Sequence, residues 1–182
     1  MQKFFTFNLL LLLSTISIVT STTIIPIEVT ALNSNLYRPN ASLNECTPNL
    51  NLDKFIVHQE SSRFKILKSC ITVSGIVTLV HTPSDGDTVF ALKLDDQYRN
   101  LVNQANYDDP NMDGGIWVEL ICQHKNTSKE PIHHGDCVGY DGPHFPTPKV
   151  GQYVEVSGRY QLDTREGGHA EIHPTYGIKT TG

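Results

Sequence analysis

Three alternating side chains near the end of the chain have the chemistry to bind a metal ion: His169, Glu171 and His173. Residues two apart in a β-strand point to the same face, so we expect these three to face outward while Ala170 and Ile172 face the core. Two imidazoles and a carboxylate suit zinc or another transition metal. Same-face neighbours stand about 7 Å apart along a strand, so binding one ion with all three requires strand curvature. The alternative is structural, with Glu171 and His173 hydrogen-bonded to loop backbone.

Asp87 is a further candidate ligand for a divalent metal, in the turn Asp85-Gly86-Asp87. An Asp-Gly pair is also a favourable hairpin turn, so a purely structural role competes with the chemical one. The string DGDTV at residues 85–89 resembles the turn of the thermonuclease family, whose second aspartate helps to hold calcium. That resemblance implies metal-dependent phosphodiester hydrolysis. The arginine and the Asp-x-Pro-Glu element of that family do not follow Val89.

Two aromatic residues, Trp117 and Tyr153, fall at outward positions of predicted strands and are candidate ligand-binding residues. Such aromatics serve as stacking platforms in proteins that bind single-stranded nucleic acid, within a basic groove. Here the formal net charge is -5 and the basic residues are scattered. The charge therefore disfavours nucleic acid and leaves an extracellular ligand or protein, of unidentified chemistry, as the partner.

The N-terminal residues 1–21 have the layout of a secretory signal, with Lys3 followed by an uncharged apolar stretch from Phe4 to Val19. Apolar character continues to Ile27, and cleavage near residue 31 is a second option. A stretch of that length can also cross a bilayer core of about 30 Å, so a retained membrane anchor is the alternative. Either reading predicts a secreted or cell-surface protein, attached to the membrane only through this segment.

The chain has four cysteines, an even number that favours disulfides in an exported protein. Of the three pairings, we predict Cys46–Cys70 and Cys122–Cys137, because each closes a short loop beside a predicted strand. A cysteine metal site is disfavoured, since the sequence has no CxxC pair.

Period-2 alternation predicts five strands within a domain at residues 52–182, preceded by a linker or arm at 32–51. The first strand begins at Cys70 and contains Gly75, a residue typical of a bulge or bend. Between the second and third strands, residues 95–107 show the spacing of one short helix. Residues 123–149 lack any period and predict a long loop. We expect a mostly β fold, a small five-stranded closed barrel with one short helix.

The strings CITVSGIVTLVHTPSDGDTVFALKLDDQY, GIWVELIC, VGQYVEVSGRYQLD and HAEIHP resemble OB-fold-like barrels. They are similar in particular to secreted prokaryotic proteins of unassigned function that pair a DGD turn with a terminal EIHP strand. The resemblance covers about residues 64–179 and implies an exported, non-enzymatic OB-like binding module that acts through its barrel face and long loop. The alternatives are a degenerate thermonuclease-like hydrolase and a metal-binding protein that uses the His-x-Glu-x-His strand.

Overall fold

The computed structural model describes residues 46–56, 62–133 and 135–180, to which the structural statements below refer. The predicted signal or anchor at residues 1–21, with its possible extension to 31, lies outside the described residues, as does most of the predicted arm. Within the described ranges, no helix has the length and apolar character needed to cross a membrane.

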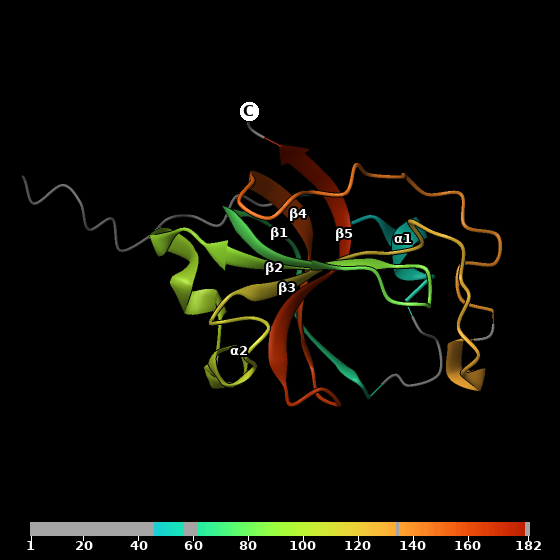
Figure 1. The fold of residues 1–182 in the computed structure, drawn as a ribbon, viewed down its shortest axis with the longest axis horizontal. Coiled ribbons are helices and arrows are strands. Elements are labelled where there is room, and N and C mark those ends of the chain that lie inside the picture. Colours follow the sequence, from blue (N-terminus) through green and yellow to red (C-terminus); the bar gives the residue numbers. More distant parts are fainter. Residues whose placement is uncertain (1–45, 57–61, 134, 181–182) are drawn as a thin grey trace, which may run out of the picture. The chain divides into compact units, whose positions relative to one another are not determined.

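Five strands form one sheet in the described part of the chain (Figure 1). Their hydrogen-bonded order is β1-β2-β3-β5-β4, and β4 pairs back with β1, so that the sheet closes into a barrel. Every pairing is antiparallel except that of β3 with β5. The prediction of a mostly β fold with five strands is confirmed. The strands are β1 (Phe64–His81), β2 (Thr88–Leu94), β3 (Ile116–Leu120), β4 (Tyr153–Asp163) and β5 (His169–Thr180).

The long strand β1 pairs with β4 along most of its length and with β2 in its second half. It begins at Phe64, so the segment before Cys70 is part of the strand. Gly75 lies where β2 crosses closely: a Cβ atom there would stand 2.1 Å from the carbonyl oxygen of Lys93. Only glycine therefore lets β2 approach β1 this closely.

Apolar side chains that alternate along the strands fill the interior of the barrel. This is the period-2 pattern that the sequence shows, with one face of each strand turned inward. The fully buried members come from all five strands: Ile71, Val73, Val77, Phe90, Leu92, Ile116, Val118, Leu120, Val154, Val156, Ala170 and Ile172. The residues between them point to the outer face, where the candidate site lies.

The helical segment between β2 and β3 differs from the prediction of one helix over residues 95–107. It contains a 3₁₀ helix, η2 (Asp96–Leu101), and a separate α-helix, α2 (Gln104–Asp108). The backbone of Asn103 is extended, and the side chains of Asn103 and Asn106 each accept a hydrogen bond from the other's backbone N–H. This reciprocal cap begins a new helix and breaks the continuous one that the apolar spacing suggests. Two other short helices are α1 (Leu50–Asp53), which starts inside the predicted arm, and η3 (Pro131–His133).

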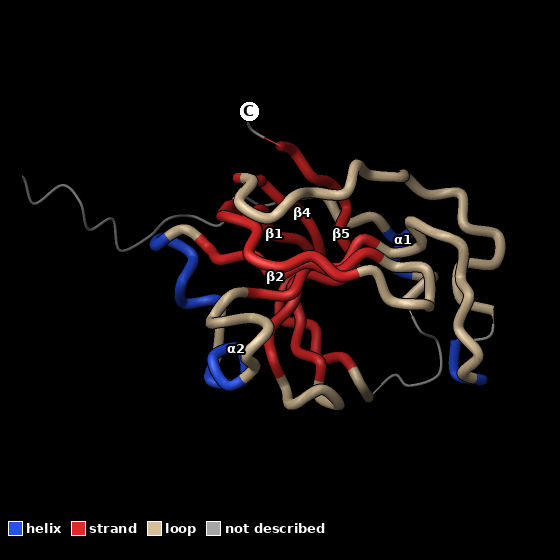
Figure 2. The backbone as a smooth tube through the Cα atoms, viewed as in Figure 1, coloured by secondary structure: helices blue, strands red, loops and turns tan. Residues whose placement is uncertain are grey.

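Both predicted disulfides, Cys46–Cys70 and Cys122–Cys137, are present in the structure. The first joins the segment before α1 to β1, and the second closes the base of the long connection from β3 to β4. In its described residues, that connection has no strand and only the short helix η3, which confirms the predicted long loop (Figure 2). Two disulfides are typical of proteins that work in an oxidising compartment.

Candidate metal centre

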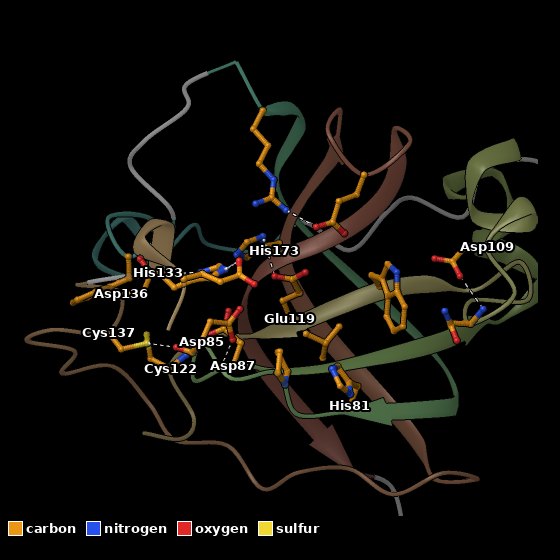
Figure 3. A pocket seen from close by; sticks show the side chains of 18 residues that line it. His81, Asp85, Asp87, Asp109, Glu119, Cys122, His133, Asp136, Cys137 and His173 are labelled. Atoms are coloured by element: carbon orange, nitrogen blue, oxygen red, sulfur yellow. Dashed lines mark hydrogen bonds and ion pairs between the residues drawn. A yellow bond between two sulfur atoms is a disulfide. The ribbon is translucent and has the colours of Figure 1, made fainter. Parts of the chain in front are cut away.

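A pocket of about 530 Å³ lies between the outer face of the sheet and the long loop (Figure 3). Trp117 and Glu119 reach it from β3, where they alternate with core residues, and His173 reaches it from β5. The full lining is Phe55, Arg63, His81, Pro83, Asp85, Asp87, Val89, Asp109, Asn111, Trp117, Glu119, Cys122, Glu130, His133, Asp136, Cys137, Glu166 and His173.

Three potential metal ligands, Asp87, Glu119 and His173, meet at one end of this pocket. One ligand atom from each lies within 4.8 Å of the others, and Figure 3 shows the side chains pointing toward one another. The Nδ1 atom of His173 is 3.2 Å from Oε2 of Glu119. Asp87 comes from the turn before β2, so the cluster draws on three separate segments of the chain.

Strand register explains why these residues meet. The parallel pairing of β3 with β5 sets Trp117 opposite Glu171 and Val118 opposite Ile172. One step further along both strands, Glu119 and His173 come side by side on the outer face. Val89 pairs with Glu119 on the other side of β3, which brings the turn that precedes β2 to the same place.

The turn itself fixes the direction of Asp87. Its backbone N–H donates to Oδ1 of Asp85 at 3.0 Å, an Asx-type turn, and Gly86 has a φ of +110° that glycine adopts freely. From the end of β3, the backbone N–H of Cys122 donates to Oδ1 of Asp87 at 2.7 Å. Among the described residues, no hydrogen bond reaches Oδ2 of Asp87, which leaves that oxygen available for a ligand.

Glu171 lies behind the cluster and supports it. It is only 1% exposed, and its Oε1 accepts a hydrogen bond from Nε2 of Gln161 at 2.7 Å. The same oxygen is 3.3 Å from Nδ1 of His173, and Oε2 is 3.5 Å from Nε2 of His169. Glu171 therefore contacts both imidazoles, and at His173 it approaches the same ring nitrogen, Nδ1, that faces Glu119.

The outward face of the His-x-Glu-x-His strand is covered, so these side chains do not reach solvent. His169, Glu171 and His173 are 4%, 1% and 6% exposed. The outer face of β5 is covered, since the ring of Phe64 packs edge-on against His173 with centroids 5.3 Å apart. The three residues also do not gather around one point, because His169 lies outside the lining of the pocket.

Burial and charge shift the pKa values of the cluster. Burial, and secondarily the charge of Asp85, raises the pKa of Asp87 to about 6. Burial also raises the pKa of Glu119, and the neighbouring carboxylates add to this against the attraction of His173. Burial alone would lower the pKa of His173, but Glu119 and Glu171 outweigh it and raise the value. The cluster therefore retains protons near neutral pH, and these are what a bound cation would displace.

Of the two candidate ligand-binding residues, Trp117 belongs to the lining of the pocket and Tyr153 does not. Tyr153 lies outside the lining, and its hydroxyl donates to Oδ2 of Asp95 at 2.6 Å, which also accepts from Ser74. The sequence interpretation missed Glu119, although its outward position two residues after Trp117 was a usable signal.

The lining of the pocket is strongly acidic. Seven carboxylate residues contribute to it: Asp85, Asp87, Asp109, Glu119, Glu130, Asp136 and Glu166. Within that lining the single Lys or Arg residue is Arg63, which forms ion pairs with Asp163 and Glu166. A pocket of this charge attracts cations and repels polyanions such as nucleic acid.

No protein-family model matches the sequence, and no curated protein matches it as a relative. The geometry of the pocket is therefore the basis for a proposed function.

Proposed function

We propose that this protein is an exported binding module whose ligand is a divalent metal ion, held by Asp87, Glu119 and His173. The single observation that carries the proposal is the convergence of ligand atoms from three chain segments within 4.8 Å, inside a concave pocket. The pocket lies between the barrel face and the long loop, the two surfaces expected to act in a binding module of this kind.

The donor set indicates which ions fit. One imidazole nitrogen with two carboxylate oxygens suits borderline and hard divalent ions, of which Zn²⁺ and Mn²⁺ are the best matches. Three protein ligands leave coordination positions open to water or to a ligand from solution. Glu119 is 20% exposed on the pocket side, and its one ion pair among the described residues is with His173. It can therefore turn toward an ion without leaving another buried partner unsatisfied.

Phosphodiester hydrolysis, implied by the resemblance to thermonucleases, has weaker support. Asp87 does lie in the cluster, as that resemblance requires. The only guanidinium in the pocket lining is Arg63, and it is already paired with carboxylates, so nothing free remains there to neutralise a phosphate. The incubation of purified protein with DNA and calcium tests this alternative, and cleavage above background would favour it.

We also propose that the barrel is a variant of the OB-fold type. The five-stranded closed order supports this, since the OB-fold is a small five-stranded barrel. The pair η2 and α2 falls between β2 and β3, whereas a standard OB-fold has its helix between the third and fourth strands. The two disulfides support export to an oxidising compartment.

The test uses two matched histidines on β5. Protein with both disulfides intact, purified without a tag, is titrated calorimetrically with Zn²⁺, Mn²⁺ and Ca²⁺. We expect one ion to bind per chain, His173→Gln to abolish binding, and His169→Gln to retain it, because of these two histidines His173 lines the pocket and His169 does not. Absence of binding at millimolar metal, or an equal loss in both variants, would overturn the proposal.

A further inference from the structure

We infer that reduction of the Cys122–Cys137 disulfide creates a second metal site, in which both thiolates and Asp87 bind a thiophilic ion such as Zn²⁺. The inference rests on the proposed function, because the two metal sites share Asp87. Whether Cys122 and Cys137 are oxidised or reduced then determines which ligand atoms the pocket presents to a metal ion. The oxidised pocket presents nitrogen and oxygen donors, and the reduced pocket adds sulfur.

The sulfur atoms already lie beside the shared ligand. Both Sγ atoms and a carboxylate oxygen of Asp87 are within 4.8 Å of one another. Cys122 also donates its backbone N–H to Asp87, so the disulfide and the ligand are coupled through one peptide group. A Cβ atom at Gly86 would stand 3.4 Å from Sγ of Cys137, which shows how closely the turn packs on the disulfide.

The geometry is compatible with coordination after reduction. With Zn–S bonds of about 2.3 Å, tetrahedral coordination separates two sulfurs by roughly 3.8 Å. The Cα atoms of Cys122 and Cys137 are 5.3 Å apart, so rotation about the side-chain bonds is sufficient to reach that separation. Thiolates favour zinc and cadmium over manganese and calcium, and reduction should therefore change the metal preference of the pocket.

The disulfide is also open to a reductant. Both cysteines line the pocket, and Cys137 is half-buried, whereas Cys46 and Cys70 lie outside the lining. A thiolate of a dithiol reductant attacks one sulfur, which breaks the protein S–S bond, forms a mixed disulfide and expels the other cysteine as a thiolate. The second thiol of the reductant then attacks the reductant's own sulfur in the mixed disulfide and expels the remaining cysteine. The reductant becomes a cyclic disulfide, while Cys122 and Cys137 gain two electrons and two protons. Metal binding releases those protons to solvent.

The experiment uses Co²⁺ as a spectroscopic probe in the variant C46S/C70S, which contains a single cysteine pair. The protein is titrated with Co²⁺ before and after treatment with dithiothreitol and its anaerobic removal. We expect sulfur-to-cobalt charge-transfer absorption only after reduction, and zinc binding at least roughly tenfold tighter than in the oxidised form. The absorption should be absent from C122S/C137S treated in the same way.

His173→Gln separates this inference from the proposed function. In the C46S/C70S background it should abolish metal binding by the oxidised protein yet keep the cobalt–thiolate absorption of the reduced protein. Absence of that absorption after reduction, or its presence in C122S/C137S, would overturn the inference.

A second measurement in the wild type keeps the test decisive if the cysteine variants do not fold. Zinc should slow the alkylation of Cys122 and Cys137 in the reduced wild type relative to Cys46 and Cys70, as mapped by mass spectrometry. Equal alkylation rates with and without zinc would overturn the inference.

Discussion

Replacing Glu119 with Gln should weaken metal binding and, at the same time, stabilise the metal-free protein. The substitution keeps the shape of the side chain and removes its charge. Loss of one of three ligands should reduce affinity by at least roughly 100-fold, since removal of a mere outer-shell partner costs 10–100-fold. A site that holds like charges together for function is costly to stability, so removing one charge should weaken metal binding and raise the stability of the metal-free protein.

The stabilisation follows from the charges that surround Glu119. With an effective dielectric constant of about 20, the attraction to His173 at 3.2 Å is worth roughly 5 kcal/mol. Repulsion from Asp87, within 4.8 Å, opposes it by at least roughly 3.5 kcal/mol, and Glu171 adds a second repulsion. These terms nearly cancel, so folding at pH 7 must either desolvate the carboxylate without compensation or protonate it, which is the direction of its raised pKa. We expect a gain of about 1–3 kcal/mol in the free energy of unfolding of the metal-free variant.

Two assays measure the two effects. Zinc affinity is obtained by competition with a chromophoric chelator, and stability by urea denaturation at pH 7 in the presence of EDTA. The matched control is Glu166→Gln, which removes a carboxylate that lines the same pocket but is 62% exposed and paired with Arg63. The control should keep its zinc affinity and change stability by no more than about 0.5 kcal/mol.

Either measurement can refute the reasoning. Unchanged zinc affinity in Glu119→Gln would remove this residue from the ligand set. A metal-free variant that is less stable than the wild type by more than about 1 kcal/mol would show that the ion pair with His173 outweighs desolvation.

Three further predictions concern the frame that holds the site. Asn106→Ala should destabilise the protein by about 3–5 kcal/mol in urea denaturation, because the buried side-chain amide forms hydrogen bonds with the backbone of residues 115 and 170. The exposed control Gln104→Ala should cost less than about 1 kcal/mol. Gly75→Ala should cost about 2–3 kcal/mol through its contact with the neighbouring strand, whereas Gly177→Ala, with open space around its Cβ, should cost less than about 1 kcal/mol; equal thermal shifts would contradict this. Burial raises the pKa of Glu171, but hydrogen bonds from the flanking imidazoles outweigh it and lower the pKa from 4.5 to about 2. The contribution of ionised Glu171 to the free energy of unfolding is therefore complete above pH 4.5 and is lost as the pH falls toward 2. The difference in unfolding free energy between the metal-free wild type and Glu171→Gln should therefore shrink over that range, and a constant difference would contradict the assignment.

Part of the site could be predicted from local sequence. Asp87 follows a glycine in a tight turn, and His173 lies on a strand whose alternation is plain. Both signals arise within a few residues and depend on backbone preferences that neighbouring residues set. The two disulfides depend on a different signal, since each closes a loop of modest length, with sequence separations of 24 and 15.

The helix between β2 and β3 shows where local patterns mislead. Apolar residues at helical spacing predicted one continuous helix over residues 95–107, but the reciprocal cap between Asn103 and Asn106 starts a second one. Side-chain hydrogen bonds to the backbone compete with helix continuation, and the apolar period does not record them.

The His-x-Glu-x-His strand shows the larger limit. Its alternation gives a shared face for His169, Glu171 and His173, yet it does not indicate what covers that face or which strand lies next to it. The adjacent strand is β3, in parallel pairing, and it supplies Glu119 from more than fifty positions earlier in the chain. A pairing this distant depends on how the whole sheet closes.

The sequence by itself determined the strands, the disulfides and two of the three candidate ligands, because each depends on neighbouring residues or short loops. Only the tertiary structure decided that Glu171 supports the cluster from behind while Glu119 faces the pocket. The physical reason is that closure of the barrel, through the parallel pairing of β3 with β5, sets which side chains meet across strands and which are covered.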